Sequence, residues 1–147
     1  MVGRFVKNFL RPFRKFSSNF VSIVNENSIV RKAAWILAAE KVEGDYLEFG
    51  VYDGGSIIQA QHEMEEAFRE QMKEGGGRTR EAANEIREIW SKMRFFAFDS
   101  FQGLPEIEGI DAKGSDFEEG TWSYNEEGFR RNLSKSGFPM SSLVTVP

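Results

Sequence analysis

The sequence contains no cysteine and a single histidine among its 147 residues. The absence of cysteine excludes a disulfide framework and a cysteine-ligated zinc or iron–sulfur centre. His62 stands in a charged stretch, which favours a surface position over a role in a Ser-His-Asp triad or a zinc site. No apolar run approaches the roughly 20 residues of a membrane-spanning helix. We therefore expect a cytoplasmic protein without a transmembrane segment.

Acidic residues outnumber basic ones outside the N-terminus. The formal net charge is −4, yet the first 20 residues carry basic side chains and no acid, so the rest of the chain is more acidic than the total indicates. An acidic body argues against nucleic acid as the main partner, because phosphate binding needs a basic face. The chain is 40% hydrophobic and has 14 phenylalanines, which is enough for a folded core.

The N-terminal part, residues 1–43, is predicted to be a helical segment in front of a domain at 44–147. Phenylalanines recur at helical spacing at positions 5, 9, 13, 16 and 20, although Pro12 breaks or kinks such a helix. We interpret residues 1–26 as an element that docks onto the domain or onto a dimer partner. A basic amphipathic element at a membrane surface is the alternative, which Pro12 makes less favourable.

Periodicity and turn residues predict alternating helices and strands. In chain order we expect a helix at 28–42, a strand at 46–51, helices at 56–73 and about 79–93, a strand at 94–98, a long loop at 102–122, a helix from a capping box at 123–126 to Gly137, and a strand at 143–146. The order β-α-β-α-β with long crossovers predicts an α/β fold with a parallel sheet.

Two segments combine an apolar strand with a special turn. The first, GDYLEFGVYDGGS (44–56), ends in a glycine-rich turn, and the second, FFAFDSFQGLP (95–105), places Asp99 at the end of its strand. Glycines allow a ligand to approach the backbone, and a strand-end carboxylate can accept hydrogen bonds from both ribose hydroxyls. The pair predicts a nucleoside-cofactor site, with a turn cap as the alternative role of Asp99.

Both segments resemble the macrocin O-methyltransferase family of S-adenosylmethionine-dependent enzymes, from Gly44 to the last residue. The resemblance implies a class I methyltransferase with a Rossmann-like sheet that transfers a methyl group to a hydroxyl of a small molecule, such as a sugar-bearing one. Glu48 would orient the glycine turn and the amino-acid end of the cofactor. Phe101 and Leu104 would line the adenine site, with a position in the core as the alternative for either. The residues that it assigns to the cofactor are Glu48, Phe49, Gly50, Val51, Gly54, Gly55, Ser56, Asp99, Ser100 and Phe101. Related enzymes hold Mg²⁺ with aspartates of the later half, so no metal ligand or catalytic base is assigned to this chain.

The predicted sheet ends at its third strand, whereas the methyltransferase fold pairs the first strand with a fourth. We therefore expect the N-terminal half of a longer domain, inactive as it stands, because an unpaired apolar edge is unfavourable. Two alternatives remain open. One is a nicotinamide-dependent oxidoreductase on the same fold, and the other is a non-catalytic half-domain that acts by interaction, for example as a homo-oligomer.

Overall fold

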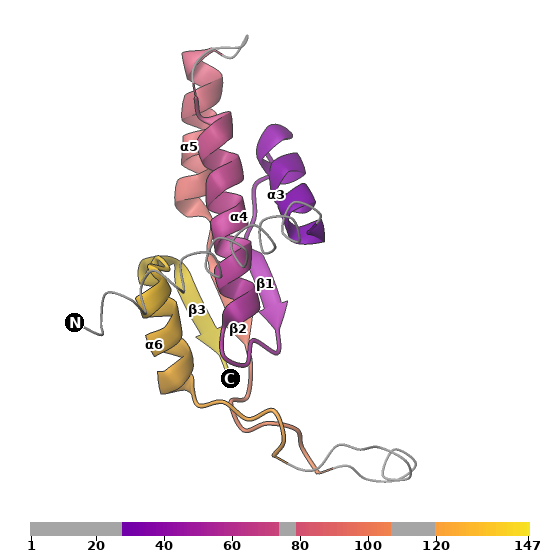
Figure 1. Ribbon diagram of the computed structural model, residues 1–147. Helices are drawn as coiled ribbons and strands as arrows, with labels where there is room; N and C mark the ends of the chain where they lie inside the picture. Colours follow the sequence, from indigo (N-terminus) through magenta and orange to yellow (C-terminus); the bar gives the residue numbers. More distant parts are fainter. Residues whose placement is uncertain (1–27, 74–78, 107–119) are drawn as a thin grey trace, which may run out of the picture.

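The computed structural model describes residues 28–73, 79–106 and 120–147. These residues form an α/β unit (Figure 1). The elements in chain order are α3 (Ile29–Ala39), β1 (Tyr46–Phe49), α4 (Gly55–Gln71), α5 (Arg80–Lys92), β2 (Phe95–Phe98), α6 (Glu126–Ser136), the short 3₁₀ helix η1 (Met140–Ser142) and β3 (Leu143–Val146). The N-terminal segment 1–26 and most of the loop 102–122 lie outside the described residues, so their predicted roles stay predictions. In the three described ranges no helix is both long and apolar enough to cross a bilayer.

The three strands form a parallel sheet in the order β1-β2-β3, which confirms the predicted α/β class. Tyr46 of β1 pairs with Phe95 of β2, which pairs in turn with Leu143 of β3. Aromatic and β-branched residues fill the strands, as is usual for a pleated surface. Within the described part of the chain β1 is an edge strand. The arrangement is compatible with a fragment of a Rossmann-like fold.

Several element boundaries differ from the predicted ones. Helix α3 ends at Ala39, before Lys41 adopts a left-handed backbone with φ 54°. The predicted capping box is wrong, because Asn125 is the N-cap of α6 and its side chain accepts a hydrogen bond from the Gly128 N–H. Asn at this position caps as well as Ser does. Gly137 is confirmed as the C-cap of α6.

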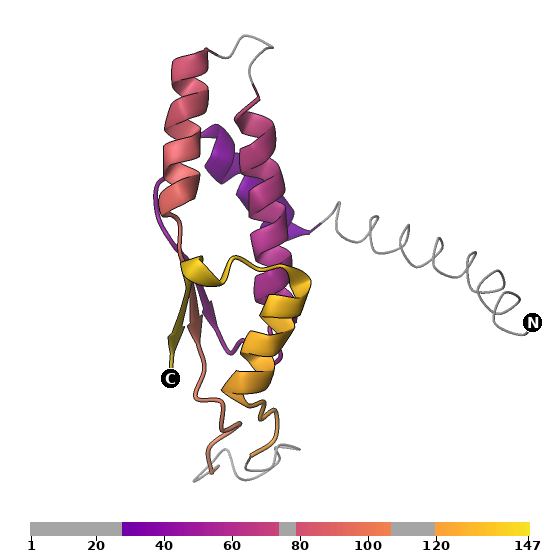
Figure 2. The same cartoon turned by 90° about the vertical axis from the view of Figure 1, so that its left-hand side faces the viewer.

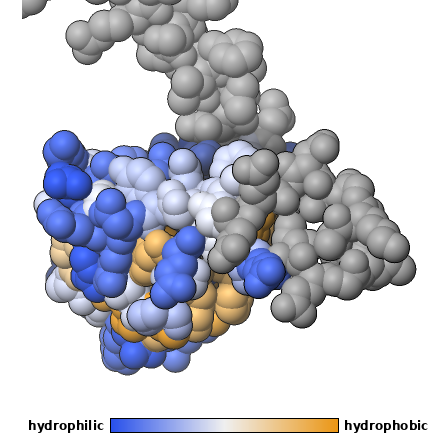
Figure 3. Space-filling view, turned by 90° about the horizontal axis from the view of Figure 1, so that it is seen from below, coloured by the Kyte–Doolittle hydropathy of each residue, from blue (hydrophilic) through white to orange (hydrophobic). Residues whose placement is uncertain are grey.

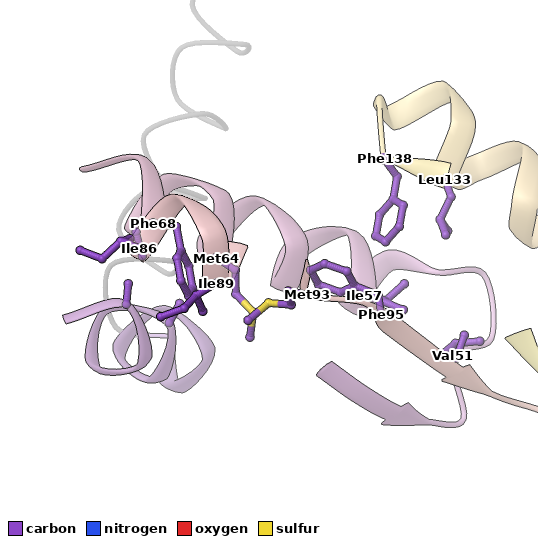
Figure 4. Packing of buried hydrophobic residues seen from close by; sticks show 14 of the residues in the cluster. Val51, Ile57, Met64, Phe68, Ile86, Ile89, Met93, Phe95, Leu133 and Phe138 are labelled. Carbon is purple, nitrogen blue, oxygen red and sulfur yellow. The ribbon is translucent and has the colours of Figure 1, made fainter. Parts of the chain in front are cut away.

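Helices α4 and α6 lie on one side of the sheet, and α3 and α5 lie beyond the end at which the strands begin, as the side view shows (Figure 2). Phe95 and Ala97 of β2 point into this helical layer and are buried. The ring of Phe95 lies 5.3 Å from that of Phe138 (Figure 4). Farther along α4, Phe68 packs near Ile86 and Ile89 of α5. Burial of these large side chains stabilises the fold by about 1.5–3 kcal/mol each.

An ion pair fastens α3 to α4. The Arg31 guanidinium lies 3.1 Å from carboxylate oxygens of both Glu63 and Glu66. The Glu63 side chain is only 6% exposed, so Arg31 supplies the charge partner that a buried carboxylate needs. This contact holds α3 beside the helix that follows the glycine turn.

The opposite side of the sheet presents six apolar side chains that share one face by strand register. They are Leu47, Phe49, Phe96, Phe98, Val144 and Val146, and we call them the open face. Phe49 is 75% exposed and stacks on Phe98 with ring centres 4.6 Å apart. From the end to which the strands point, hydrophobic residues are visible along one side of the molecule (Figure 3). The described residues leave this face without a covering layer.

Candidate functional site

The glycine turn after β1 and the turn after β2 meet at the carboxyl ends of the strands. The Asp99 carboxylate joins them, since its Oδ2 accepts a hydrogen bond from the Tyr52 N–H at 3.0 Å and its Oδ1 accepts one from the Phe101 N–H at 2.7 Å. Asp99 is therefore a turn cap, as the alternative interpretation predicted. A carboxylate offers about four acceptor positions, so each oxygen keeps capacity for a ligand hydroxyl.

A hollow of about 590 Å³ opens beside this carboxylate. Its lining residues are Gly50, Tyr52, Phe98, Asp99, Ser100, Gly103, Leu104 and Trp122. Gly50 and Asp99 of its lining directly follow β1 and β2, at the arrowhead ends of the strands in Figure 1, and ligands bind to open parallel sheets at this edge. Its size falls in the range of small-molecule sites, about 300–1,000 Å³.

The glycines of the first turn have different surroundings. Gly50 is left-handed, with φ 77°, and a Cβ there would meet no described atom within 4 Å. Gly54 is also left-handed, but a Cβ would collide with the Leu133 side chain and lie 3.1 Å from the Phe129 ring. Gly54 is thus required for packing against α6, whereas Gly50 leaves room for a ligand. Sequence reasoning had given both glycines the same role.

Glu48 lies on the helix side of β1 and does not line the hollow. Its carboxylate accepts a hydrogen bond from the Tyr46 hydroxyl at 2.7 Å and another from the Ser56 hydroxyl at 2.5 Å. Burial, followed by the hydrogen bond to Glu48, raises the pKa of Tyr46 above its usual value. Glu48 therefore ties β1 to the first turn of α4, which agrees with its predicted part in orienting the loop.

Aromatic side chains extend the site toward α6. Tyr52 lies 6.0 Å from Trp122 and 5.3 Å from Tyr124, measured between ring centres. Asn132 of α6 donates hydrogen bonds to the Asp53 carbonyl at 3.1 Å and to the Tyr124 hydroxyl at 3.0 Å. Trp122 is 66% exposed. This group leaves an indole ring at the rim of the hollow, on which a planar or sugar ring can stack.

The structure brings only some of the predicted site residues to the hollow. Gly50, Asp99 and Ser100 line it, together with Leu104. Val51 and Gly54 are buried, and Gly55 and Ser56 begin α4.

Two predicted contact residues instead make other contacts. Phe49 lies on the open face, where its ring stacks on Phe98. The ring centre of Phe101 lies 5.5 Å from that of the core residue Phe129, which agrees with the core position that was its alternative role.

Sequence reasoning missed Trp122, Phe98 and Gly103. The signal that could have found Trp122 is an aromatic residue at the end of a long polar loop, a position typical of binding loops.

The chain matches no family model, no curated protein and no solved structure in the comparisons with known proteins. Across the described ranges no three His, Asp or Glu side chains gather as ligands for a metal ion. The geometry of the strand-end hollow and the two sequence segments are therefore the grounds on which a function can be proposed.

Proposed function

We propose that the strand-end hollow binds the nucleoside part of S-adenosylmethionine, in a class I methyltransferase domain that methylates a hydroxyl of a small molecule. The observation that carries the proposal is the position of Asp99, at the end of β2 and hydrogen-bonded to the glycine turn of β1. This places a carboxylate with spare acceptor capacity at the rim of an open hollow, where two ribose hydroxyls could donate to it. The resemblance of both segments to the macrocin O-methyltransferase family supports the choice of cofactor.

In this proposal the described residues bind and position the cofactor. The bound cofactor would supply an electrophilic methyl group for in-line displacement. Asp99 would hold the ribose, Gly50 would let the cofactor approach the backbone, and Glu48 would fix the turn through Ser56. Positioning of this kind contributes to catalysis by fixing the reacting atoms in line. The exposed ring of Trp122 would contact the adenine or a sugar-bearing acceptor.

Calorimetric titration of the full chain with S-adenosylhomocysteine tests the proposal. Asp99→Asn should weaken binding by about tenfold or more, because a charged acceptor of two hydroxyl hydrogen bonds is lost. Asp45→Asn is the matched control, since Asp45 bonds to Arg94 at the other end of the strands. Equal affinity of the wild type and Asp99→Asn, with circular dichroism showing both folded, would refute the proposed ribose contact.

Competition separates this cofactor from a nicotinamide dinucleotide. We expect S-adenosylhomocysteine to bind in the presence of excess NADH with nearly unchanged affinity. Displacement by NADH at comparable concentration would instead favour the oxidoreductase alternative, because a strand-end acid suits the ribose of either cofactor.

The open face favours a second candidate, a domain that acts through self-association. Leu47 and Phe49 are exposed and the other four side chains of the open face are partly exposed, so they form a contiguous apolar patch rather than the scattered exposure that is normal for a protein surface. In this candidate a second copy of the chain covers the face, which would make the protein a homodimer.

A further inference from the structure

A second hollow, of about 360 Å³, lies at the opposite end of the strands from Asp99. It is enclosed by α4, the end of α5, the start of β2 and the connection from α6 to β3. Its lining residues are Gln61, Glu65, Trp90, Ser91, Met93, Phe95, Gly137, Pro139, Ser141 and Ser142. None of them lines the hollow at Asp99, so this space is separate from the proposed cofactor site.

Gln61 gives this hollow an unused buried acceptor. The residue is 2% exposed, and its Nε2 donates a hydrogen bond to Glu65 Oε2 at 2.8 Å. No group of the described residues donates to its Oε1. A buried polar atom without a partner destabilises a protein by about 1–3 kcal/mol, so such atoms usually have a partner in the functional state.

Two serine hydroxyls and a carboxylate of the wall also present acceptors. The Ser91 hydroxyl donates its hydrogen to the Glu88 carbonyl, and the Ser142 hydroxyl donates to the Pro139 carbonyl, both at 2.8 Å. These two hydroxyls therefore keep only lone pairs for a ligand. Glu65 adds a carboxylate that no ion pair of the described residues neutralises. The complementary ligand is thus a positively charged hydrogen-bond donor.

The apolar wall suits the same ligand. Trp90 is held in place by stacking on Phe68 with ring centres 5.3 Å apart and by an edge contact to Phe95 at 6.4 Å. A fixed indole attracts an ammonium or guanidinium group within about 6 Å of its ring. Met93 provides a flexible apolar surface for an alkyl stem.

We propose that this second hollow binds a small organic cation whose ammonium or guanidinium N–H groups donate to Gln61 Oε1 and to the Glu65 carboxylate. Its carbon stem lies against Trp90 and Met93. The volume of the hollow is within the range of small-molecule sites, about 300–1,000 Å³. The site is independent of the proposed cofactor, because it lies at the other end of the sheet.

Nuclear magnetic resonance titration of the full chain with n-butylamine and with methylguanidine tests this proposal, with n-butanol as the neutral probe. The indole signal of Trp90 and the side-chain amide signal of Gln61, assigned with Trp90→Phe and Gln61→Leu, report on the hollow. At constant ionic strength and pH 7, we expect saturable shifts with at least one cation and about tenfold weaker binding of n-butanol. Shifts that do not saturate, or equal binding of n-butanol, would overturn the proposal.

Substitutions of Glu65 and Gln61 test whether these two acceptors bind the cation. Glu65→Gln keeps the shape of an exposed side chain and should weaken cation binding by about tenfold, since the charge is lost. Glu127→Gln on α6 is the control with the same change of charge, because the Glu127 side chain is 88% exposed and lies outside the hollow. Gln61→Leu should also abolish the cation shifts of Trp90. Unchanged affinity in Glu65→Gln would show that the cation binds elsewhere, whether or not Gln61→Leu folds.

Discussion

Gly50 and Gly54 are four residues apart, and both have a left-handed backbone, but only Gly54 is surrounded by side chains. Gly54 is therefore needed for the turn to pack in the fold, whereas Gly50 leaves space that a ligand can occupy. Gly54→Ala adds a methyl group against Leu133 and Phe129 as well as backbone strain, so we expect a loss of about 2–4 kcal/mol in the free energy of unfolding.

Gly50→Ala carries the strain alone and should lower the free energy of unfolding by only about 1 kcal/mol. It should nevertheless weaken binding of S-adenosylhomocysteine, because the methyl group enters space next to the hollow. Urea unfolding and calorimetric titration of both variants measure these effects. If both variants lose the same free energy of unfolding, the close packing around Gly54 does not contribute to stability as expected.

At the scale of the elements, a charged contact joins the entry of β1 to the entry of β2. Asp45 accepts hydrogen bonds from the Arg94 backbone N–H at 2.9 Å and from two guanidinium nitrogens at 3.2 and 2.7 Å. The hydrogen bond from the Arg94 side chain holds the pKa of Asp45 below its usual value, against a smaller opposing effect of burial. The ionised carboxylate therefore stabilises the paired strands.

This contact predicts a pH dependence of stability. Because the pKa of Asp45 is lower in the folded state, its stabilisation is present at neutral pH and is lost as pH falls through the folded pKa. Asp45→Asn should be less stable than the wild type at pH 7, and the difference should shrink below about pH 4. Urea unfolding from pH 7 to pH 2 measures it. Hydrogen bonds from Arg130 and Thr145 also lower the pKa of Glu126, so its stabilisation is likewise lost at low pH. Some acid sensitivity of stability therefore remains in the variant. If the difference in free energy of unfolding between the wild type and Asp45→Asn stays constant with pH, the ionised form of Asp45 does not stabilise the fold.

Local signals explain which elements could be predicted from the sequence. The alternation of helical and strand patterns gave the order and the parallel sheet, because both depend on apolar spacing. The N-cap of α6 was misplaced by two residues, since Ser123 and Asn125 are equally good caps and only the packing of α6 decides between them. Trp122 lies in a segment distant from Gly50 and Asp99, so its place after a polar loop indicates a binding loop but not which residues it meets at the hollow.

At the scale of the whole molecule, the described residues are asymmetric. One face of the sheet is packed under α4 and its neighbours, while the open face presents large apolar side chains. Parallel sheets are usually covered on both faces. Burial of the open face would therefore stabilise the molecule, at about 25 cal/mol per Å² of apolar surface.

Self-association of the chain is the prediction that follows from this asymmetry. Phe49→Glu places a charge at the most exposed position of the open face, 75% exposed, so it should raise the dissociation constant of a homodimer by about tenfold or more. The fold itself should keep its stability, because the Phe49 ring contributes little to the buried core. Ile36→Glu is the matched control, since Ile36 is 61% exposed on α3 and lies away from the sheet. Sedimentation velocity over a range of concentrations measures the association. A wild-type chain that stays monomeric at high concentration would refute the homodimer, and equal weakening by both variants would place the contact elsewhere.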